Sequence, residues 1–174
     1  MKVVITGSGS GLGLALLNTF KKIGYIVVGY DIKDGKDIRA KETVDQLLVD
    51  CKDADVFVNN ALDNQIALLE SVVDLWKDQQ KTIINISSAI TYYFTVDDVV
   101  PRDYIDQKST LDRLIKLHQH KLPFIMNVRP DWFDSEMVKD FNQEKMNTGD
   151  LANMIVSLYS NRSIRILDIV ATGK

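Results

Sequence analysis

Several short runs of this sequence are apolar at every position, and this feature restricts the fold more than any other. Val56–Val58 and Ile83–Ile84 contain no polar residue, whereas a strand with one face in water alternates apolar and polar side chains. Continuously apolar strands need cover on both faces, and a parallel sheet with helices on either side provides it. The chain is therefore expected to form a three-layer α/β domain.

The rest of the sequence fits this fold, because β-branched runs alternate with longer amphipathic segments. No repeat, linker or low-complexity stretch divides the chain, so residues 1–174 are expected to form a single domain. We predict strands at residues 2–6, 25–30, 56–59, 82–87, 123–128 and 163–170. We predict helices at residues 11–23, 41–52, 64–80, 103–120 and 148–160.

Composition and charge argue against several kinds of protein. The net charge is −3 and the basic residues are scattered, unlike the Lys/Arg-rich face of a nucleic-acid binder. No apolar stretch approaches the roughly 20 residues that cross a bilayer. The run from Lys2 to Gly7 leaves no room for a signal peptide, and Cys51, the single cysteine, cannot form an internal disulfide. We expect a cytoplasmic protein that binds neither nucleic acid nor membranes.

A glycine-rich segment, Thr6–Gly13, lies where the first predicted strand leads into the first predicted helix. Glycine lets the backbone turn sharply and approach a pyrophosphate, and the helix N-terminus offers free N–H groups with partial positive charge. A tight strand-to-helix turn without a ligand is the alternative interpretation. As a dinucleotide-binding loop, the segment would contact the cofactor through Gly7, Ser10, Gly11, Leu12 and Gly13.

An acidic residue, Asp31, follows the second predicted strand, roughly 20 residues beyond the glycine segment. A carboxylate there accepts hydrogen bonds from the adenosine ribose hydroxyls and repels a 2′-phosphate. Loop and acid together predict a Rossmann-type, doubly wound parallel sheet that binds NAD rather than NADP. Lys33 and Lys36 could soften that preference, and a simple strand-end turn is the alternative role for Asp31.

Three further segments, with the glycine loop, resemble the short-chain dehydrogenase/reductase family from Lys2 to about Thr172. Asn59-Asn60-Ala61 is similar to the family's Asn-Asn-Ala-Gly stretch, which borders the cofactor, although Leu62 replaces the glycine. Ser87-Ser88 resembles the serine pair that ends a family strand. Tyr104 and Lys108 have the family's Tyr-x-x-x-Lys spacing, which puts both side chains on one helical face.

The resemblance implies that Ser88, Tyr104 and Lys108 are catalytic. Tyr104 would be the acid/base, provided that its pKa falls from ~10 toward the working pH. The Lys108 ammonium would favour the phenolate by its charge and bind the nicotinamide ribose. Ser88 would hydrogen-bond the substrate oxygen. A solvated helix face is the alternative for an isolated Tyr-x-x-x-Lys, and the order of the other segments argues against it.

The segment after the fifth predicted strand resembles the family's Pro-Gly loop, with departures. Pro130 is retained, whereas Asp131 replaces the glycine. The resemblance implies that the Phe133 backbone meets the nicotinamide carboxamide and that Ser135 replaces a threonine hydroxyl at the cofactor.

Two other intervals are shorter than in the family. Between Asp31 and Lys41 there is no room for the usual second helix and third strand, although Asp37-Ile38 resembles the pair that meets adenine. That pair marks either a strand stub or a plain surface turn. A single helix fills the interval between Asn60 and Asn85, and the family's active-site asparagine has no clear counterpart there.

These observations favour an NAD(H)-dependent oxidoreductase that transfers a hydride to or from a small carbonyl or alcohol substrate. A catalytically weak NAD-binding redox sensor or regulatory protein is the first alternative. An epimerase or dehydratase with bound NAD is the second, and the glycine spacing counts against it. The family often pairs through helices that match residues 64–80 and 103–120, so a homo-oligomer is expected. No metal site is expected, because His118 and His120 do not share a helical face.

Overall fold

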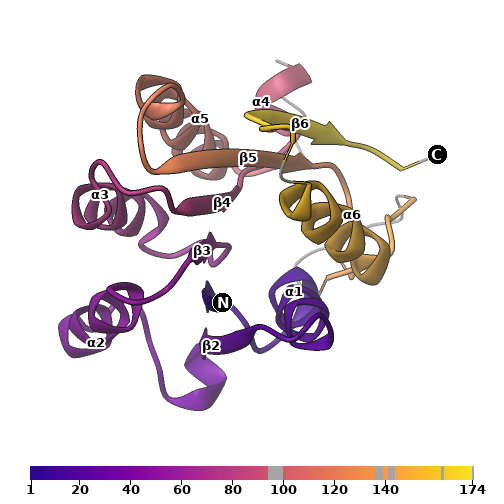
Figure 1. Ribbon diagram of the computed structural model, residues 1–174. Coiled ribbons are helices and arrows are strands. Elements are labelled where there is room, and N and C mark those ends of the chain that lie inside the picture. The colour runs from indigo at the N-terminus through magenta and orange to yellow at the C-terminus, as the bar shows by residue number, and fades with distance from the viewer. Residues whose placement is uncertain (94–99, 136–138, 141–143, 162, 174) are drawn as a thin grey trace.

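A six-stranded parallel sheet runs through the molecule in the computed structural model, with helices on both faces (Figure 1). The structure describes residues 1–93, 100–135, 139–140, 144–161 and 163–173. The strands, in the sheet order β2-β1-β3-β4-β5-β6, are β2 (Ile26–Tyr30), β1 (Lys2–Thr6), β3 (Val56–Asn59), β4 (Thr82–Ile86), β5 (Phe124–Pro130) and β6 (Asp168–Ala171). The helices are α1 (Gly11–Lys22), α2 (Lys41–Cys51), α3 (Gln65–Leu75), α4 (Ile90–Tyr93), α5 (Arg102–His118) and α6 (Thr148–Ser160). This is the predicted Rossmann-type, doubly wound parallel sheet in three layers.

Alternate side chains of each strand enter two separate cores, as the continuous apolar runs require. On one face, Val3, Val58 and Ile84 pack with α1 and α6. On the other face, Val4, Phe57 and Ile83 pack with α2, α3 and α5. The inner strands β1, β3 and β4 therefore bury both faces, and helices cover each face of the sheet.

The predicted elements are present, with differences at their ends. The last strand begins at Asp168 rather than at residue 163, because regular pairing with β5 starts at the Asn127–Asp168 pair. Helix α3 ends at Leu75 rather than at residue 80, since Trp76 leaves the helical conformation (φ −102°, ψ 14°) and Asp78 has a positive φ of 62°. The short helix α4 was not predicted.

The segment between β2 and α2 contains no strand, so the strand stub suggested at Asp37-Ile38 is wrong. The chain turns there, but the Ile38 side chain is buried in the core and not on the surface. A single turn of 3-10 helix, η1 (Ile32–Asp34), follows Asp31, whose carboxylate accepts from the N–H of Lys33. The Asp37 carboxylate accepts from the Arg39 N–H in the next turn. Strand β2 is therefore the edge of the sheet.

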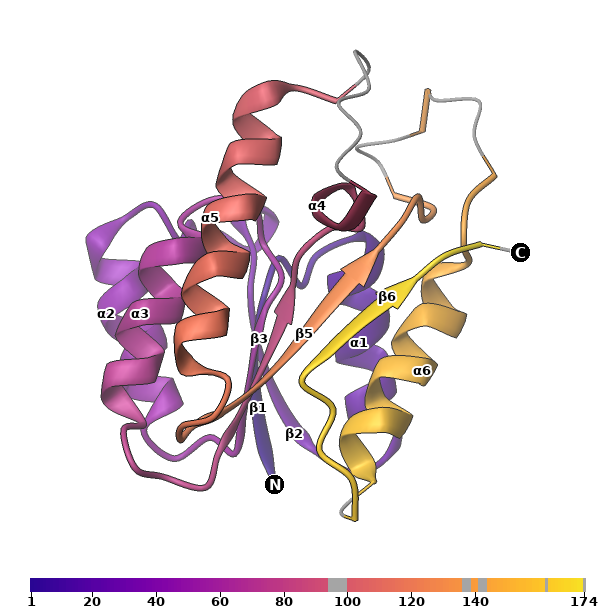
Figure 2. The same cartoon turned by 90° about the horizontal axis from the view of Figure 1, so that it is seen from above.

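The sheet reverses direction between β1 and β3. The chain moves outward from β1 to β2, and then crosses over to β3 on the other side of β1. In open parallel sheets, ligands bind at the carboxyl ends of the strands at such a switch point. The two loops there are the glycine segment after β1 and Asn60-Ala61 after β3. Figure 2 shows α4 and the N-terminal end of α5 at the same end of the strands.

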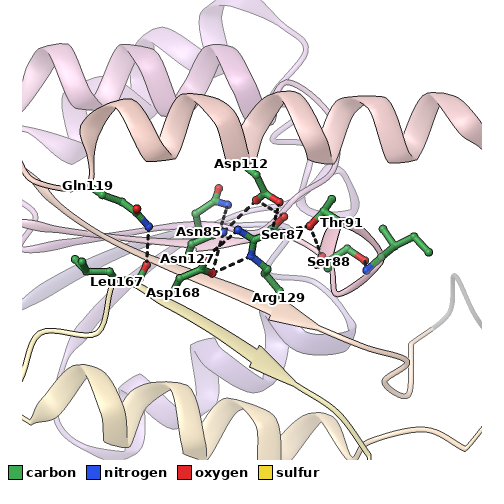
Figure 3. A network of polar contacts seen from close by, with 11 residues as sticks. Asn85, Ser87, Ser88, Thr91, Asp112, Gln119, Asn127, Arg129, Leu167 and Asp168 are labelled. Carbon is green, nitrogen blue, oxygen red and sulfur yellow. Dashed lines mark hydrogen bonds and ion pairs between the residues drawn. The ribbon is translucent and has the colours of Figure 1, made fainter. Parts of the chain in front are cut away.

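A row of amides crosses the sheet on the face covered by α3 and α5. Asn59, Asn85 and Asn127 occupy paired positions on β3, β4 and β5. The Asn59 amide N–H donates to Asn85 Oδ1 at 3.1 Å, and the Asn85 amide N–H donates to Asn127 Oδ1 at 2.9 Å. Asn127 in turn donates to the Asp112 carboxylate of α5 at 3.0 Å (Figure 3).

Arg129 completes this network from the end of β5. Its guanidinium pairs with Asp112 at 2.8 Å and with Asp168 of β6 at 2.7 Å. It also donates to Thr91 Oγ1 of α4 at 2.9 Å. One buried side chain therefore joins β5, β6, α4 and α5 (Figure 3).

Within the described residues, every helix is too short or too polar to be a candidate for a membrane span.

Removal of the Arg129 guanidinium should destabilise the fold strongly. Arg129→Met leaves Asp112 buried without its cation, which typically costs about 3–5 kcal/mol. Arg39→Met is the matched control, because Arg39 also pairs with an aspartate, but its side chain is 57% exposed against 7% for Arg129. An exposed pair contributes little, because water screens the two charges. Urea unfolding of both variants measures the difference, and equal losses of stability would contradict this account of the network.

Candidate functional site

The glycine segment forms a cradle that side chains would fill. A Cβ on Gly13 would lie 1.9 Å from the Gly7 carbonyl oxygen, and Gly7 itself has a positive φ of 68°. Ser10 is the N-cap residue of α1, yet its side chain makes no capping hydrogen bond, and no acidic residue lies in the first turn. The first N–H groups of α1, from Gly11 to Gly13, therefore point with the positive end of the helix dipole toward any bound anion.

Thr6 and Asn60 tie this cradle to the neighbouring loop. The Thr6 hydroxyl accepts from the Asn60 N–H at 3.0 Å and from the Ala61 N–H at 3.1 Å. The Asn60 amide donates to the carbonyls of Thr6 at 3.0 Å and Gly7 at 3.3 Å. The loops after β1 and β3 thus form one unit at the switch point, and Asn60 acts on the glycine segment directly.

Asp31 lies against the glycine segment as well as at the end of β2. One of its carboxylate oxygens accepts from the Gly9 N–H at 2.8 Å, and the other accepts from the Lys33 N–H at 2.9 Å. A Cβ on Gly9 would lie 2.6 Å from this carboxylate. Beside Asp31 is a pocket of about 280 Å³, whose lining includes Gly7, Ile38 and Ala61.

A larger pocket of about 690 Å³ lies between α1 and α6 and reaches the start of α1 at Ser10 and Gly11. Ser135 lines it, and its Cβ would lie 3.6 Å from a Cβ added at Gly11. The loop after β5 therefore reaches the glycine segment. In the same loop, Phe133 bridges to Met146, while the carbonyl of buried Pro130 accepts from the Ala89 N–H at 2.9 Å.

The two serines after β4 have different surroundings. Ser87 is buried and donates to the Asp112 carboxylate at 2.7 Å (Figure 3). Ser88 is half-buried and hydrogen-bonds the Tyr104 side chain from α5. The structure thus brings together the serine and the tyrosine that the sequence proposed as a pair.

The pKa of Tyr104 differs from the sequence expectation. Burial raises the pKa of this phenol above its ordinary value of 10.0, and the hydrogen bond with Ser88 offsets only part of that rise. The net shift is therefore opposite to the lowering expected from Lys108, whose ammonium makes its hydrogen bonds to other residues. Its Nζ lies 5.6 Å from the centroid of the Tyr104 ring.

Lys108 is buried among neutral acceptors. Its Nζ donates to Gln65 Oε1 at 2.7 Å and to the Ile86 carbonyl at 3.0 Å. Burial lowers the pKa of Lys108 to about 8, and the charge of Asp112, one turn along α5, acts in the opposite direction. The ammonium therefore lies near the end of β4, two residues before Ser88.

One site residue was missed from the sequence, and another lies deeper than a direct contact with a cofactor implies. Gln65 was read only as part of a helix, although it follows a strand end at the switch-point side of the sheet, where ligand sites gather. Asn59 was predicted to contact the cofactor, and the structure places it fully buried, with its amide on Gln65 O and Asn85. Its effect on any ligand would pass through these neighbours.

Two other kinds of chemistry find no support among the described residues. No group of three His, Cys, Asp or Glu side chains there could hold a metal ion. Cys51 is buried, and burial raises the pKa of its thiol to about 12, which is opposite to the shift of a reactive cysteine.

No family model and no curated protein matches this sequence. Solved structures do. A short-chain dehydrogenase from Burkholderia cenocepacia in complex with NADP aligns with a TM-score of 0.79 at 16% identity, over 99% of this chain and 88% of that chain. A 3-ketoacyl-(acyl-carrier-protein) reductase from Brucella melitensis complexed with NADH aligns with a TM-score of 0.74 at 20% identity, over 99% and 96% of the two chains. An alcohol dehydrogenase from Thermococcus sibiricus complexed with 5-hydroxy-NADP aligns with a TM-score of 0.71 at 14% identity, over 98% and 95%.

These similarities show that the chain has the fold of the short-chain dehydrogenases/reductases. At such identities they define the fold alone.

The Tyr104 phenol should ionise late in the protein without ligand. Because burial raises its pKa, the difference in tyrosinate absorbance between the unmodified protein and Tyr104→Phe should develop above pH 10. Ser88→Ala should move this ionisation to still higher pH, since the Ser88 hydrogen bond lowers the pKa. A Tyr104 ionisation between pH 6 and 8 in the free protein would show that the described environment is wrong.

Proposed function

We propose that this chain is an NAD(H)-dependent oxidoreductase that transfers a hydride to or from a small carbonyl or alcohol substrate. The observation that carries the proposal is the meeting of Ser88, Tyr104 and Lys108 at the carboxyl end of β4. The glycine cradle, at the switch point of the same sheet, also lies at the carboxyl ends of the strands. A dinucleotide bound across these strand ends would place its phosphates on the cradle and its reactive ring toward the three side chains.

The cradle fits a dinucleotide because glycines stand at the positions of closest approach and the Ser10 side chain does not cap the first N–H groups of α1. Asp31 offers carboxylate oxygens to the adenosine ribose, and the pocket beside it would take the adenine between Ile38 and Ala61. The remaining residues proposed to contact or support the cofactor are Gly7, Ser10, Gly11, Leu12, Gly13, Asn59, Asn60, Tyr104, Lys108, Pro130, Phe133 and Ser135. When bound, NAD(H) supplies or accepts the hydride.

The three proposed catalytic residues divide the remaining chemistry. Tyr104 gives a proton to the carbonyl oxygen of the substrate, or takes one from the alcohol. Ser88 donates a hydrogen bond to the same oxygen and stabilises the charge that develops on it. Lys108 holds a positive charge near the tyrosine, and a phenolate there becomes less costly.

Asp31 supports NAD over NADP. The similar structures contain both kinds of cofactor, NADP in one case and NADH in another, so their fold does not decide between the two. A carboxylate at the adenosine ribose repels a 2′-phosphate. Lys36 does not cancel this charge by direct pairing, since its Nζ donates to the Gly29 carbonyl at 3.0 Å.

A catalytically weak NAD-binding sensor is the second candidate. It is favoured by the raised pKa of Tyr104 and by the hydrogen bonds of the Lys108 ammonium to Gln65 and Ile86.

For either function we propose a homo-oligomer in the cytoplasm. The lone buried thiol of Cys51 fits a reducing compartment, and α5 leaves Leu117 exposed for a partner.

Asp31 should determine the choice of cofactor. The unmodified protein should bind NADH more tightly than NADPH, and Asp31→Ala should narrow the gap, because the variant removes both the ribose acceptor and the repulsion. Fluorescence titration with the two dinucleotides measures this. Asp45→Ala is the control, since Asp45 carries the same charge but pairs with Lys41 on α2 and does not line the pocket beside Asp31. Equal affinities of the unmodified protein for the two dinucleotides would remove the argument.

Tyr104→Phe should abolish turnover while NADH affinity stays nearly unchanged, because the ring still packs. Ser88→Ala should lower turnover by ~10²-fold, the usual effect of losing one oxyanion donor. Lys108→Ala should reduce both turnover and affinity. A screen of small aldehydes, ketones and alcohols first identifies a substrate. A substrate that Tyr104→Phe turns over as fast as the unmodified protein would contradict the assignment, whereas NADH binding without any reaction would support the sensor.

A further inference from the structure

Gln65 has a buried polar side chain that contacts Lys108 of the candidate site. It is the first residue of α3 and follows Asn64, which has a positive φ of 55° and donates to the Ile38 carbonyl at 2.8 Å. This turn aims the first side chain of the helix back toward the ends of β3 and β4. Gln65 is 0% exposed. It is a buried polar residue at the start of an apolar stretch, Ile66-Ala67-Leu68-Leu69.

All of the hydrogen-bonding groups of this amide are used. Its N–H groups donate to the carbonyls of Asn59 and Ile86, both at 2.8 Å. Its oxygen accepts from the Lys108 ammonium at 2.7 Å. Because Lys108 also donates to the Ile86 carbonyl, amide and ammonium share one acceptor at the end of the strand that leads to Ser88.

The ammonium therefore has a fixed position, and no carboxylate of the described residues is in contact with it. From α3 it meets the neutral amide of Gln65, and from β4 a backbone carbonyl. On its own helix the titratable neighbours are Tyr104 and Asp112, and Asp112 pairs with Arg129 at 2.8 Å. A carboxylate at position 65 would neutralise the charge, whereas an amide orients the ammonium and leaves the charge available.

We propose that Gln65 is a positioning residue, which holds the Lys108 ammonium at the end of β4 for the cofactor and for Tyr104. This inference rests on the proposed function. It gives a role to a buried glutamine that ties α3, β3, β4 and α5 together at a single point.

The test compares two substitutions of Gln65 with a matched glutamine. Gln65→Met removes the acceptor of the ammonium, and Gln65→Glu replaces it with a charged one. Gln107→Met is the control, because Gln107 neighbours Lys108 in the chain and donates to the Leu62 carbonyl at 2.8 Å, so its loss removes a similar bond between α5 and the same loop. Circular dichroism identifies the variants that fold, and Gln65→Glu carries the test if Gln65→Met does not.

Two properties are measured for each folded variant, the pKa of Lys108 and the affinity for NADH. NMR titration of the lysine side chains, with the Lys108 signal assigned from Lys108→Arg, should show Lys108 titrating near pH 8 in the unmodified protein. Gln65→Glu should raise that pKa by roughly one unit or more, Gln65→Met should lower it, and Gln107→Met should leave it unchanged. Gln65→Met should also weaken NADH binding by about tenfold, against less than about twofold for Gln107→Met.

The two possible failures are distinguishable. An unmodified protein that binds no NADH overturns the proposed function. A protein that binds NADH, but in which the Lys108 titration is unmoved by the folded Gln65 variants or starts near the ordinary lysine value, overturns the role of Gln65 alone. Opposite shifts in the two variants support it, since a merely structural role would not produce them.

Discussion

The buried hydrogen-bonded chain from Asn59 to Arg129 is the constraint on which the rest of the site depends. Three amides on adjacent strands donate in one direction, and the Asp112 carboxylate sets that direction because it can only accept. No amide in the row can be reversed without leaving a carboxylate or carbonyl unpaired. The carboxyl ends of β3, β4 and β5 are thereby held in one register beneath α3 and α5.

Helix α5 connects this network to the chemistry. Tyr104, Lys108 and Asp112 lie four residues apart on one face, so the half-buried tyrosine, the buried ammonium and the fully engaged carboxylate follow one another into the protein. The Asp112 carboxylate accepts hydrogen bonds from Ser87, Asn127 and Arg129. These contacts hold α5 against the sheet. At the other end of the amide row, Asn59 donates to the Gln65 carbonyl at 2.9 Å. The same network thus extends from Asp112 to Gln65, whose side chain accepts from the Lys108 ammonium.

Much of the fold and part of the site follow from local sequence. The β1 loop was predictable because glycines, helix start and preceding strand are adjacent in the chain. Ser88 and Tyr104 were singled out by their resemblance to family segments, and the structure brings the two side chains together. The contacts of Lys108 were not predictable, since Gln65 lies 43 residues away and no local pattern marks its orientation. Arg129 and its two aspartates likewise come from three separate elements. The strand stub at Asp37-Ile38 failed because a short apolar-acidic pair forms a turn as readily as a strand.

The central claim is that the switch point between β1 and β3 binds NAD(H) in front of Ser88, Tyr104 and Lys108. A crystal structure of the protein grown with NADH tests it most directly. The account predicts the pyrophosphate at the start of α1, the adenosine ribose on Asp31, and the nicotinamide within reach of Tyr104. Crystals that hold NADH away from the glycine cradle, or that hold none at saturating concentration, would contradict it.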